Sequence, residues 1–319
     1  MSLLEIKNLK VHYPIKGGIL SRTIGHVKAV DGVSLTIDEG QTVGLVGESG
    51  SGKSTIGKAI LGLAHITDGQ ILFEGKDITR QIKKNRSPFR KSVQMIFQDV
   101  YSSLNARERV LDIIAEPLRN FEKLTKAEEK KRVEELLSIV GLPESSISKY
   151  PFEFSGGQRQ RIGVARAIAL KPKLIVADEP VSALDLSVQA QVLNHMKEIQ
   201  KNLSLAYLFI SHDLGVVRHM CENLAIMHNA RFVEYGTRKD IYDNPTHIYT
   251  KRLISAIPDI SPRNRAKNKA FRSEINAAYN SGAETFYKDG NEVYDLKKIS
   301  DTHYVALLDG GIGSVENNR

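Results

Sequence analysis

Short apolar runs alternate with helical patterns along residues 1–255. Residues 174–177 and 205–210 are continuous apolar runs, which are typical of strands buried on both faces of a parallel sheet. Residues 4–13 and 41–47 are strand-like segments bounded by turns. Because strands lie on both sides of a helical region, the pattern predicts an α/β core interrupted by a helical subdomain.

Three other segments carry local predictions. Residues 224–229 and 230–236 are two apolar runs that predict an antiparallel pair of strands. Residues 27–37 are strand-like, whereas residues 15–25 contain glycines and have no periodic pattern, which predicts a surface loop. A helix is expected after residue 52, with an apolar face made by Ile56, Ile60 and Leu63.

The helical subdomain is expected at about residues 100–157. Thr125 and Glu128 have the spacing of a capping box at a helix start, and Gly141 is placed to end that helix. A further helix is predicted over residues 158–170. The buried face of the first helix has apolar residues at helical spacing, namely Val133, Leu136, Leu137 and Val140.

The texture of the chain changes after residue 255. Pro258 and Pro262 frame a basic stretch, and short strand-like segments follow it. We therefore expect residues 1–255 to form the main domain and residues 256–319 to form a small C-terminal extension.

Composition narrows the class of protein. The 319 residues suit one large domain with an appendage, or two domains. The chain has 45 Lys and Arg residues against 37 Asp and Glu residues. This excess of positive charge is compatible with an ordinary basic protein, with binding to nucleic acid, or with binding to an anionic membrane surface. The basic run at residues 83–91 is similarly open, with a solvated face favoured over a phosphate-binding patch.

Cysteine content and hydropathy add two expectations. Cys221 is the only cysteine, so an internal disulfide and a multi-thiolate metal site are excluded, which fits a reducing compartment. The N-terminal segment is too charged for a signal peptide, and no run reaches the 18 or more apolar residues of a transmembrane helix. A role at a membrane would therefore require partners that hold the protein there.

A phosphate-binding loop follows the strand-like segment 41–47. Its residues fit the pattern G-x-x-x-x-G-K-[ST], in which glycines let backbone amides point at phosphate oxygens and the following helix adds its positive end. The lysine would bridge the β- and γ-phosphates of ATP, and the serine hydroxyl would ligate Mg²⁺. The predicted nucleotide-binding residues are Gly47, Glu48, Ser49, Gly50, Ser51, Gly52, Lys53, Ser54 and Thr55.

Two carboxylates follow the apolar run 174–177. Asp178 at the end of a buried strand can hold Mg²⁺ through water, and Glu179 can orient and deprotonate an attacking water. An isolated Asp-Glu pair is usually a solvated strand end. The phosphate loop upstream favours the catalytic interpretation.

A second anion-binding turn precedes the helix predicted over residues 158–170. It comprises Ser155, Gly156, Gly157 and Gln158, which place two glycines and a hydroxyl at a helix N-terminus. The same residues also make an ordinary helix entry. Two phosphate-seeking sites in one chain are unusual.

The turn at Ser155–Gln158, preceded by Phe154, resembles the signature sequence of ABC ATPases. The resemblance implies a P-loop NTPase core of the ABC type, with an antiparallel β subdomain and a helical subdomain. It also implies that two subunits dimerise head to tail, so that each signature turn caps the γ-phosphate held by its partner's loop.

The other ABC motifs follow in order along the chain. Gln98 resembles the glutamine that contacts Mg²⁺ and faces the membrane subunits, and the segment from Ser182 to Asp185 resembles the loop that crosses the dimer interface in this family. His212 resembles the histidine that contacts the γ-phosphate, although an incidental strand-end histidine is the alternative. Tyr13 resembles the aromatic residue that stacks on adenine, with a half-buried strand tyrosine as the alternative.

Within this family, residues 4–262 resemble the second of the two ATPase subunits of oligopeptide and dipeptide permeases. Val100, Ala106 and Ile248 stand where relatives often have proline, and the first two flank the surface expected to meet a membrane subunit. The lone Cys221 argues against the iron–sulphur cluster of some relatives.

The resemblance implies several partners and a location. These are a second, different ATPase subunit, two transmembrane permease subunits and an extracytoplasmic peptide-binding protein, with the chain peripheral on the cytoplasmic face of the cell membrane. A nickel or glutathione importer is the alternative within the family.

Two other classes are disfavoured. Non-transport ABC ATPases that act on nucleic acid usually carry two fused cassettes, zinc modules or coiled coils, which this chain lacks, so no nucleic-acid partner is expected. A small-molecule kinase would leave the signature turn and His212 unexplained.

Overall fold

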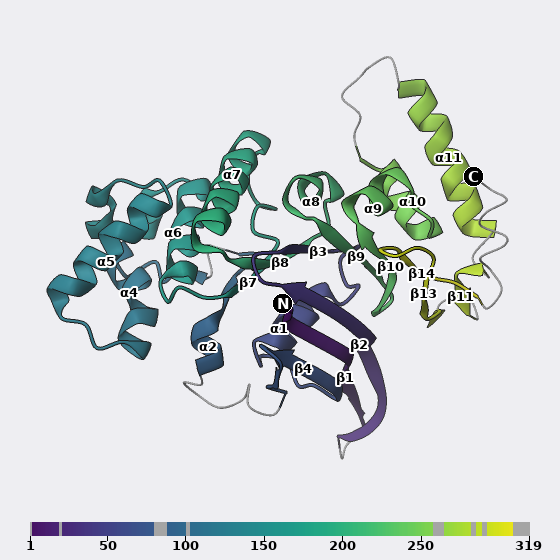
Figure 1. Ribbon diagram of the computed structural model, residues 1–319, viewed down its shortest axis with the longest axis horizontal. Coiled ribbons are helices and arrows are strands. Elements are labelled where there is room, and N and C mark those ends of the chain that lie inside the picture. The colour runs from purple at the N-terminus through teal and green to yellow at the C-terminus, as the bar shows by residue number, and fades with distance from the viewer. Residues whose placement is uncertain are drawn as a thin grey trace.

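The computed structural model describes residues 2–18, 21–79, 88–99, 103–257, 265–281, 285–288 and 292–308. A central sheet runs through the molecule, with the antiparallel sheet on one face, the helical subdomain at one end and the C-terminal region at the other (Figure 1). The predicted α/β architecture is confirmed. Val100 and residues 83–87 of the basic run lie outside the described residues.

The central sheet contains both apolar runs of the sequence as neighbouring parallel strands. Its strand order is β13-β14-β10-β9-β3-β8-β7-β6, and β9, β3, β8, β7 and β6 are parallel. Strands β9 and β10 form the predicted antiparallel pair. The main strands are β3 (Thr42–Val46), β6 (Val93–Ile96), β7 (Leu174–Asp178), β8 (Ala206–Ser211), β9 (Asn223–His228) and β10 (Arg231–Thr237).

The two faces of the central sheet face two separate cores. In β8, Tyr207 and Phe209 join one core, whereas Leu208 and Ile210 join the other. Because successive side chains of a strand point to opposite faces, a strand buried on both sides must be apolar at every position. This explains the unbroken apolar runs of β7 and β8.

The second sheet is antiparallel and corrects one prediction. Its order is β2-β1-β4-β5, with β1 Ser2–Gly17, β2 Arg22–Asp38, β4 Asp68–Phe73 and β5 Lys76–Asp77. The predicted surface loop at 15–25 was wrong at both of its ends, because residues 15–17 belong to β1, residues 22–25 belong to β2, and Ile15 pairs with Gly25. This end of the hairpin is largely solvent-exposed, so no apolar alternation is needed to form it.

Helix α1 (Lys53–Ile60) packs between the two sheets. The expected apolar face was wrong at Leu63, because the helix ends at Ile60. Leu63 lies beyond the helix end, and its side chain is 62% exposed. Gly62 at φ +73° occupies the left-handed region after the helix end. Ile56 and Ile60 are buried as expected.

The helical subdomain contains α4 (Val110–Phe121), α5 (Lys126–Ile139) and the N-terminal part of α6 (Gly156–Ile168). The Thr125–Glu128 capping box at the start of α5 is confirmed, and Gly141 at φ +68° follows its end. Helix α6 begins two residues before the predicted start, because Ser155 caps it. Two 3₁₀ turns, η1 (Glu144–Ser148) and η2 (Pro151–Glu153), connect α5 to α6.

The remaining helices are α2 (Pro88–Ser92), α7 (Leu186–Leu203), α8 (Leu214–Met220), α9 (Arg238–Asp243), α10 (Ile248–Ser255) and α11 (Arg265–Ser281). They lie beside the central sheet, except α11, which packs against α10 (Figure 1). Across the described residues, no helix is both long and apolar enough to span a lipid bilayer.

The C-terminal region is tied into the main sheet. Strand β14 (Tyr304–Ala306) pairs with β10, and β13 (Leu296–Lys298) pairs with β14. Strands β11 (Tyr287–Lys288) and β12 (Glu292–Val293) form a separate two-stranded sheet. The expected strands of the tail are present, and two of them extend the sheet that carries the phosphate loop.

Candidate nucleotide-binding site

The phosphate loop connects β3 to α1 at the carboxyl edge of the central sheet. A β-carbon on Gly47 would lie 2.1 Å from the Met227 carbonyl oxygen, and one on Gly52 would lie 2.1 Å from the Ala29 carbonyl oxygen. Gly52 also has φ +110°. Both positions therefore require glycine, because backbone atoms leave no room for a side chain.

Lys53 is held inside the loop. Its ammonium donates to the Glu48 carbonyl oxygen at 2.8 Å and lies 3.4 Å from Ser51 Oγ, and the residue is 4% exposed. Burial lowers the pKa of Lys53, while the nearby carboxylates Glu179 and Asp178 act in the opposite direction. The loop thus holds its only lysine at its centre, which suits binding to phosphate oxygens.

Ser54 and Asp178 meet between α1 and β7. The Ser54 hydroxyl donates to Asp178 Oδ1 at 2.9 Å, and Asp178 is 5% exposed. Burial raises the pKa of Asp178. These oxygen donors fit Mg²⁺, which takes one or two protein oxygens and completes its coordination with phosphates and water. The described residues contain no group of three or more His, Cys, Asp and Glu side chains that could hold a metal ion.

Glu179 is held by residues from two other strand ends. Gln98 Nε2 donates to Glu179 Oε2 at 2.8 Å, and His212 Nδ1 lies 3.0 Å from Glu179 Oε1. An ionised carboxylate only accepts hydrogen bonds, so the Nδ1 proton of His212 points at Glu179. The three predicted residues are therefore brought together, although 81 positions separate Gln98 from Glu179.

The backbone of Glu179 is unusual. Its φ of +47° lies in the left-handed region, which a non-glycine residue rarely adopts, and its N–H donates to the Ile210 carbonyl oxygen at 2.9 Å. Left-handed non-glycine residues cluster at functional sites, where surrounding contacts hold them. Here the contact is the hydrogen bond to Ile210 on β8, so the sheet edge fixes the direction of the Glu179 side chain.

The signature turn, Ser155–Gln158, forms a capping box at the start of α6. The Ser155 N–H donates to Gln158 Oε1 at 3.0 Å, and the Gln158 N–H donates to Ser155 Oγ at 3.4 Å. Both residues are exposed. A β-carbon on Gly157 would lie 2.4 Å from Val188 Cγ1, so glycine lets α6 approach α7 closely.

The segment next to the signature turn is also exposed. Asp185 precedes α7 without a side-chain capping bond, and Leu186 is 85% exposed. Among the described residues, no hydrogen bond or ion pair joins this segment or the signature turn to the phosphate loop.

Tyr13 lies on β1 opposite Val27 and is 42% exposed. It is therefore more open than the half-buried strand tyrosine considered as its alternative. Its stacking on adenine stays a prediction.

Sequence reasoning missed two residues beside the phosphate loop. The Glu48 N–H donates to the Tyr249 hydroxyl at 3.0 Å, and Arg252 lies 3.6 Å from the Glu48 carboxylate. Both residues belong to α10, and Tyr249 lies 201 positions after Glu48 in the sequence. No local sequence pattern predicts this role, because a tyrosine on an amphipathic helix is typical of an ordinary core residue.

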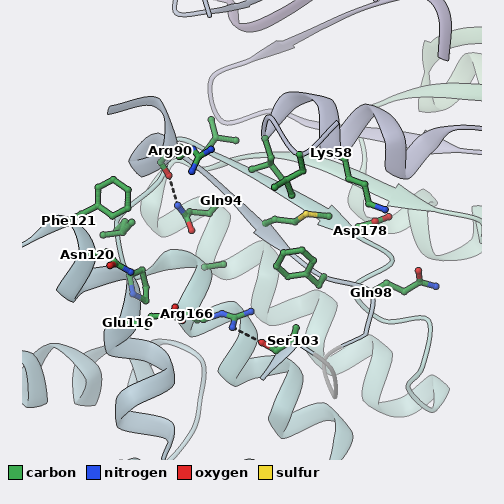
Figure 2. Close-up of a pocket in the computed structure, with 18 of the residues that line it drawn as sticks. Lys58, Arg90, Gln94, Gln98, Ser103, Glu116, Asn120, Phe121, Arg166 and Asp178 are labelled. Atoms are coloured by element: carbon green, nitrogen blue, oxygen red, sulfur yellow. Dashed lines mark hydrogen bonds between the residues drawn. The ribbon is translucent and has the colours of Figure 1, made fainter. Parts of the chain in front are cut away.

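A cavity of about 940 Å³ adjoins the site. It lies between the edge strand β6 and helices α4 and α6, with Gln98 and Asp178 at one end and Phe121 and Glu116 at the other (Figure 2). Arg166 lines it and donates to the Ser103 carbonyl oxygen at 2.7 Å. The cavity therefore connects the helical subdomain to Gln98.

Comparison with known proteins identifies the family. A model described as "ABC transporter" matches residues 30–182, and one described as "Oligopeptide/dipeptide transporter, C-terminal region" matches residues 233–286. The chain is 59% identical to the oligopeptide transport ATP-binding protein OppF of Lactococcus lactis, over 99% of each chain. This chain belongs to the ABC transporter family, as an ATPase subunit.

Other relatives agree. The oligopeptide transport ATP-binding protein AppF of Bacillus subtilis is 49% identical, covering 84% of this chain and 82% of its own length. The dipeptide transport ATP-binding protein DppF of Lactococcus lactis is 48% identical, covering 95% and 93%.

Solved structures agree on the ABC ATPase fold. The cbiO1 protein of Clostridium perfringens, part of the cbiONQ ABC transporter complex, has a TM-score of 0.64 at 27% identity, covering 76% of this chain and 91% of its own. A dimeric ATP-binding cassette bound to ADP and phosphate has a TM-score of 0.63 at 25% identity, covering 74% and 98%.

Proposed function

We propose that this chain hydrolyses ATP to drive an importer of oligopeptides or dipeptides. The relatives named as oligopeptide and dipeptide transport proteins support the substrate class. The observation that carries the catalytic part is the convergence on Glu179, whose two carboxylate oxygens are held by Gln98 and His212.

The residues at the sheet edge divide the chemistry among them. The phosphate loop, residues 47–55, binds the phosphates through its amides and Lys53. Glu179 accepts the proton of the attacking water, and His212, fixed through Nδ1, presents its other nitrogen to the γ-phosphate.

Ser54, Asp178 and Gln98 would hold Mg²⁺. Gln98 uses its amide nitrogen for Glu179, which leaves its amide oxygen as the ligand atom. When bound, Mg²⁺ neutralises charge on the phosphate oxygens during transfer.

The second half of the site comes from a partner. The exposed signature turn and Asp185 would face the nucleotide of a second, different ATPase subunit in a head-to-tail dimer. Support comes from the exposure of Ser155 and Gln158, whose capping-box bonds join them only to each other among the described residues.

Permease subunits would hold this ATPase on the cytoplasmic face of the membrane. The cavity of Figure 2 suits a docking permease segment, because Gln98 at its end would link an occupant to Glu179. An extracytoplasmic binding protein would deliver the peptide, and nucleic acid has no part in this cycle.

Peptide uptake tests the proposal. The chain is co-purified from membranes with its permease, and the complex is placed in vesicles with the co-purified binding protein. We expect ATP-dependent uptake of a labelled oligopeptide or dipeptide that stops when Lys53→Ala replaces the wild-type subunit. ATP hydrolysis stimulated by nickel or glutathione, and by no peptide, would contradict the substrate class.

A further inference from the structure

Helix α10 contacts the phosphate loop through the buried hydroxyl of Tyr249 as well as through Arg252. The Tyr249 side chain is fully buried, and its oxygen accepts the Glu48 N–H at 3.0 Å. Burial raises the pKa of the Tyr249 hydroxyl, so it keeps its proton and accepts through a lone pair. The Glu48 amide is therefore engaged by Tyr249, which corrects its predicted role, and the amides that follow it in the loop are the candidates for binding phosphate oxygens.

The ring of Tyr249 is fixed from beneath the loop. It stacks on His228 with ring centroids 4.1 Å apart, and Tyr287 Oη on β11 lies 2.9 Å from His228 Nδ1. His228 follows Met227, whose carbonyl oxygen presses on Gly47. The same short segment of β9 thus supports the loop directly and supports the tyrosine that holds it.

A buried carboxylate sets the position of α10. Glu234 on β10 is fully buried and accepts the N–H groups of Thr246 at 2.8 Å and His247 at 3.1 Å, immediately before α10. His303, one residue before β14, lies 2.7 Å from the same carboxylate. Because a buried carboxylate is costly without partners, these contacts fix the start of α10, and with it Tyr249.

We propose that Tyr249 is a positioning residue for nucleotide binding, and that the C-terminal region thereby sets the affinity of the phosphate loop for ATP. The tail strands β11 and β14 hold His228 and Glu234, and these hold the Tyr249 ring and helix. Without the hydroxyl, the Glu48 N–H loses its acceptor and the loop leaves its binding conformation. This inference rests on the proposed role of residues 47–55 as the nucleotide loop.

The test removes one oxygen from the full-length protein. Tyr249→Phe is expected to weaken Mg²⁺-ADP binding about three- to tenfold by calorimetry, the effect of losing one buried hydrogen bond. Tyr207→Phe is the matched control, because that hydroxyl is also buried but faces the Met196 carbonyl oxygen, 3.4 Å away. We expect the control to change the Kd by less than about 1.5-fold.

Two readouts separate positioning from general stability. Amide hydrogen exchange in the nucleotide-free protein should quicken at residues 47–53 in Tyr249→Phe and stay unchanged there in Tyr207→Phe. In the assembled transporter, the KM for ATP should rise by the same factor as the Kd, with a smaller change in kcat. An unchanged Kd with unchanged exchange at residues 47–53 would overturn the inference.

Two further variants keep the test decisive. If Tyr249→Phe does not fold, Tyr287→Phe removes the support of His228, and we expect about a twofold rise in the Kd; no rise would overturn the inference. Lys53→Ala tests the proposed function separately. If it binds ADP as tightly as wild type, the loop is not the nucleotide site; if only Tyr249→Phe is silent, the proposed function stands and the inference fails.

Discussion

The phosphate loop and the signature turn both lie at helix N-termini, yet their surroundings differ. Lys53 bonds within the phosphate loop, Ser54 bonds to Asp178 and Glu48 bonds to Tyr249. Residues from distant segments therefore complete the loop. Within the described chain, the side-chain bonds of Ser155 and Gln158 join these two residues only to each other. The phosphate loop is therefore supported by distant segments of its own chain, whereas the signature turn is exposed, as the proposed head-to-tail dimer requires.

A third helix start makes this comparison sharper. Thr125 and Glu128 form the same reciprocal capping box at α5 that Ser155 and Gln158 form at α6. The box of α5 begins a helix with a charged surface, whereas the box of α6 contains Gly157, which lets α6 approach α7. Identical local bonds thus begin a helix of purely structural role and the helix that carries the proposed signature turn.

The largest effect is expected at Glu179. Glu179→Gln should lower turnover about 10²- to 10⁴-fold, the usual contribution of a general base, while ATP still binds. Phosphate release by the assembled transporter measures it. Turnover near the wild-type rate would show that another group accepts the proton.

The same variant tests the partner. Glu179→Gln with ATP should trap a closed dimer with the second ATPase subunit, detected by light scattering. Efficient closed dimers of this chain alone would contradict the heterodimer.

A smaller effect is expected at Lys53. Lys53→Ala should weaken ATP binding about ten- to a hundredfold, because a charge-assisted contact with phosphate is lost from a buried site. Equilibrium binding of ATP measures this change. Lys58→Ala is the control, since Lys58 lies on the same helix toward its C-terminal end. Equal losses in both variants would argue against a specific role of Lys53.

The smallest effect separates the two capping boxes. Ser155→Ala and Thr125→Ala should each lower the free energy of unfolding by about 1 kcal/mol, the usual cost of losing a helix cap. Only Ser155→Ala should also lower turnover, by about tenfold, because only its hydroxyl would reach a partner's nucleotide. Denaturant unfolding and ATPase assays measure the pair. Equal turnover in both variants would leave the signature turn with a structural role alone.

Local features of the fold were predictable from the sequence. The phosphate loop, both helix caps and the buried strands β7 and β8 depend on residue types within a few positions of each other. The glycines at 47 and 52 predict a phosphate loop, and the unbroken apolar runs predict buried strands, with few alternative structures for either pattern. The family motifs then placed Gln98 and His212 beside this site, where periodicity alone could not.

Tertiary structure decided the rest. The exposed part of the β1–β2 hairpin has no apolar period to predict it, and the pairing of β14 with β10 joins segments some 70 positions apart. The contact between Tyr249 and the Glu48 amide depends on the register of the central sheet and on the position of α10 relative to the phosphate loop. Sequence specifies bonds that close over a few residues, whereas contacts across 201 positions exist only once the sheet has brought their elements together.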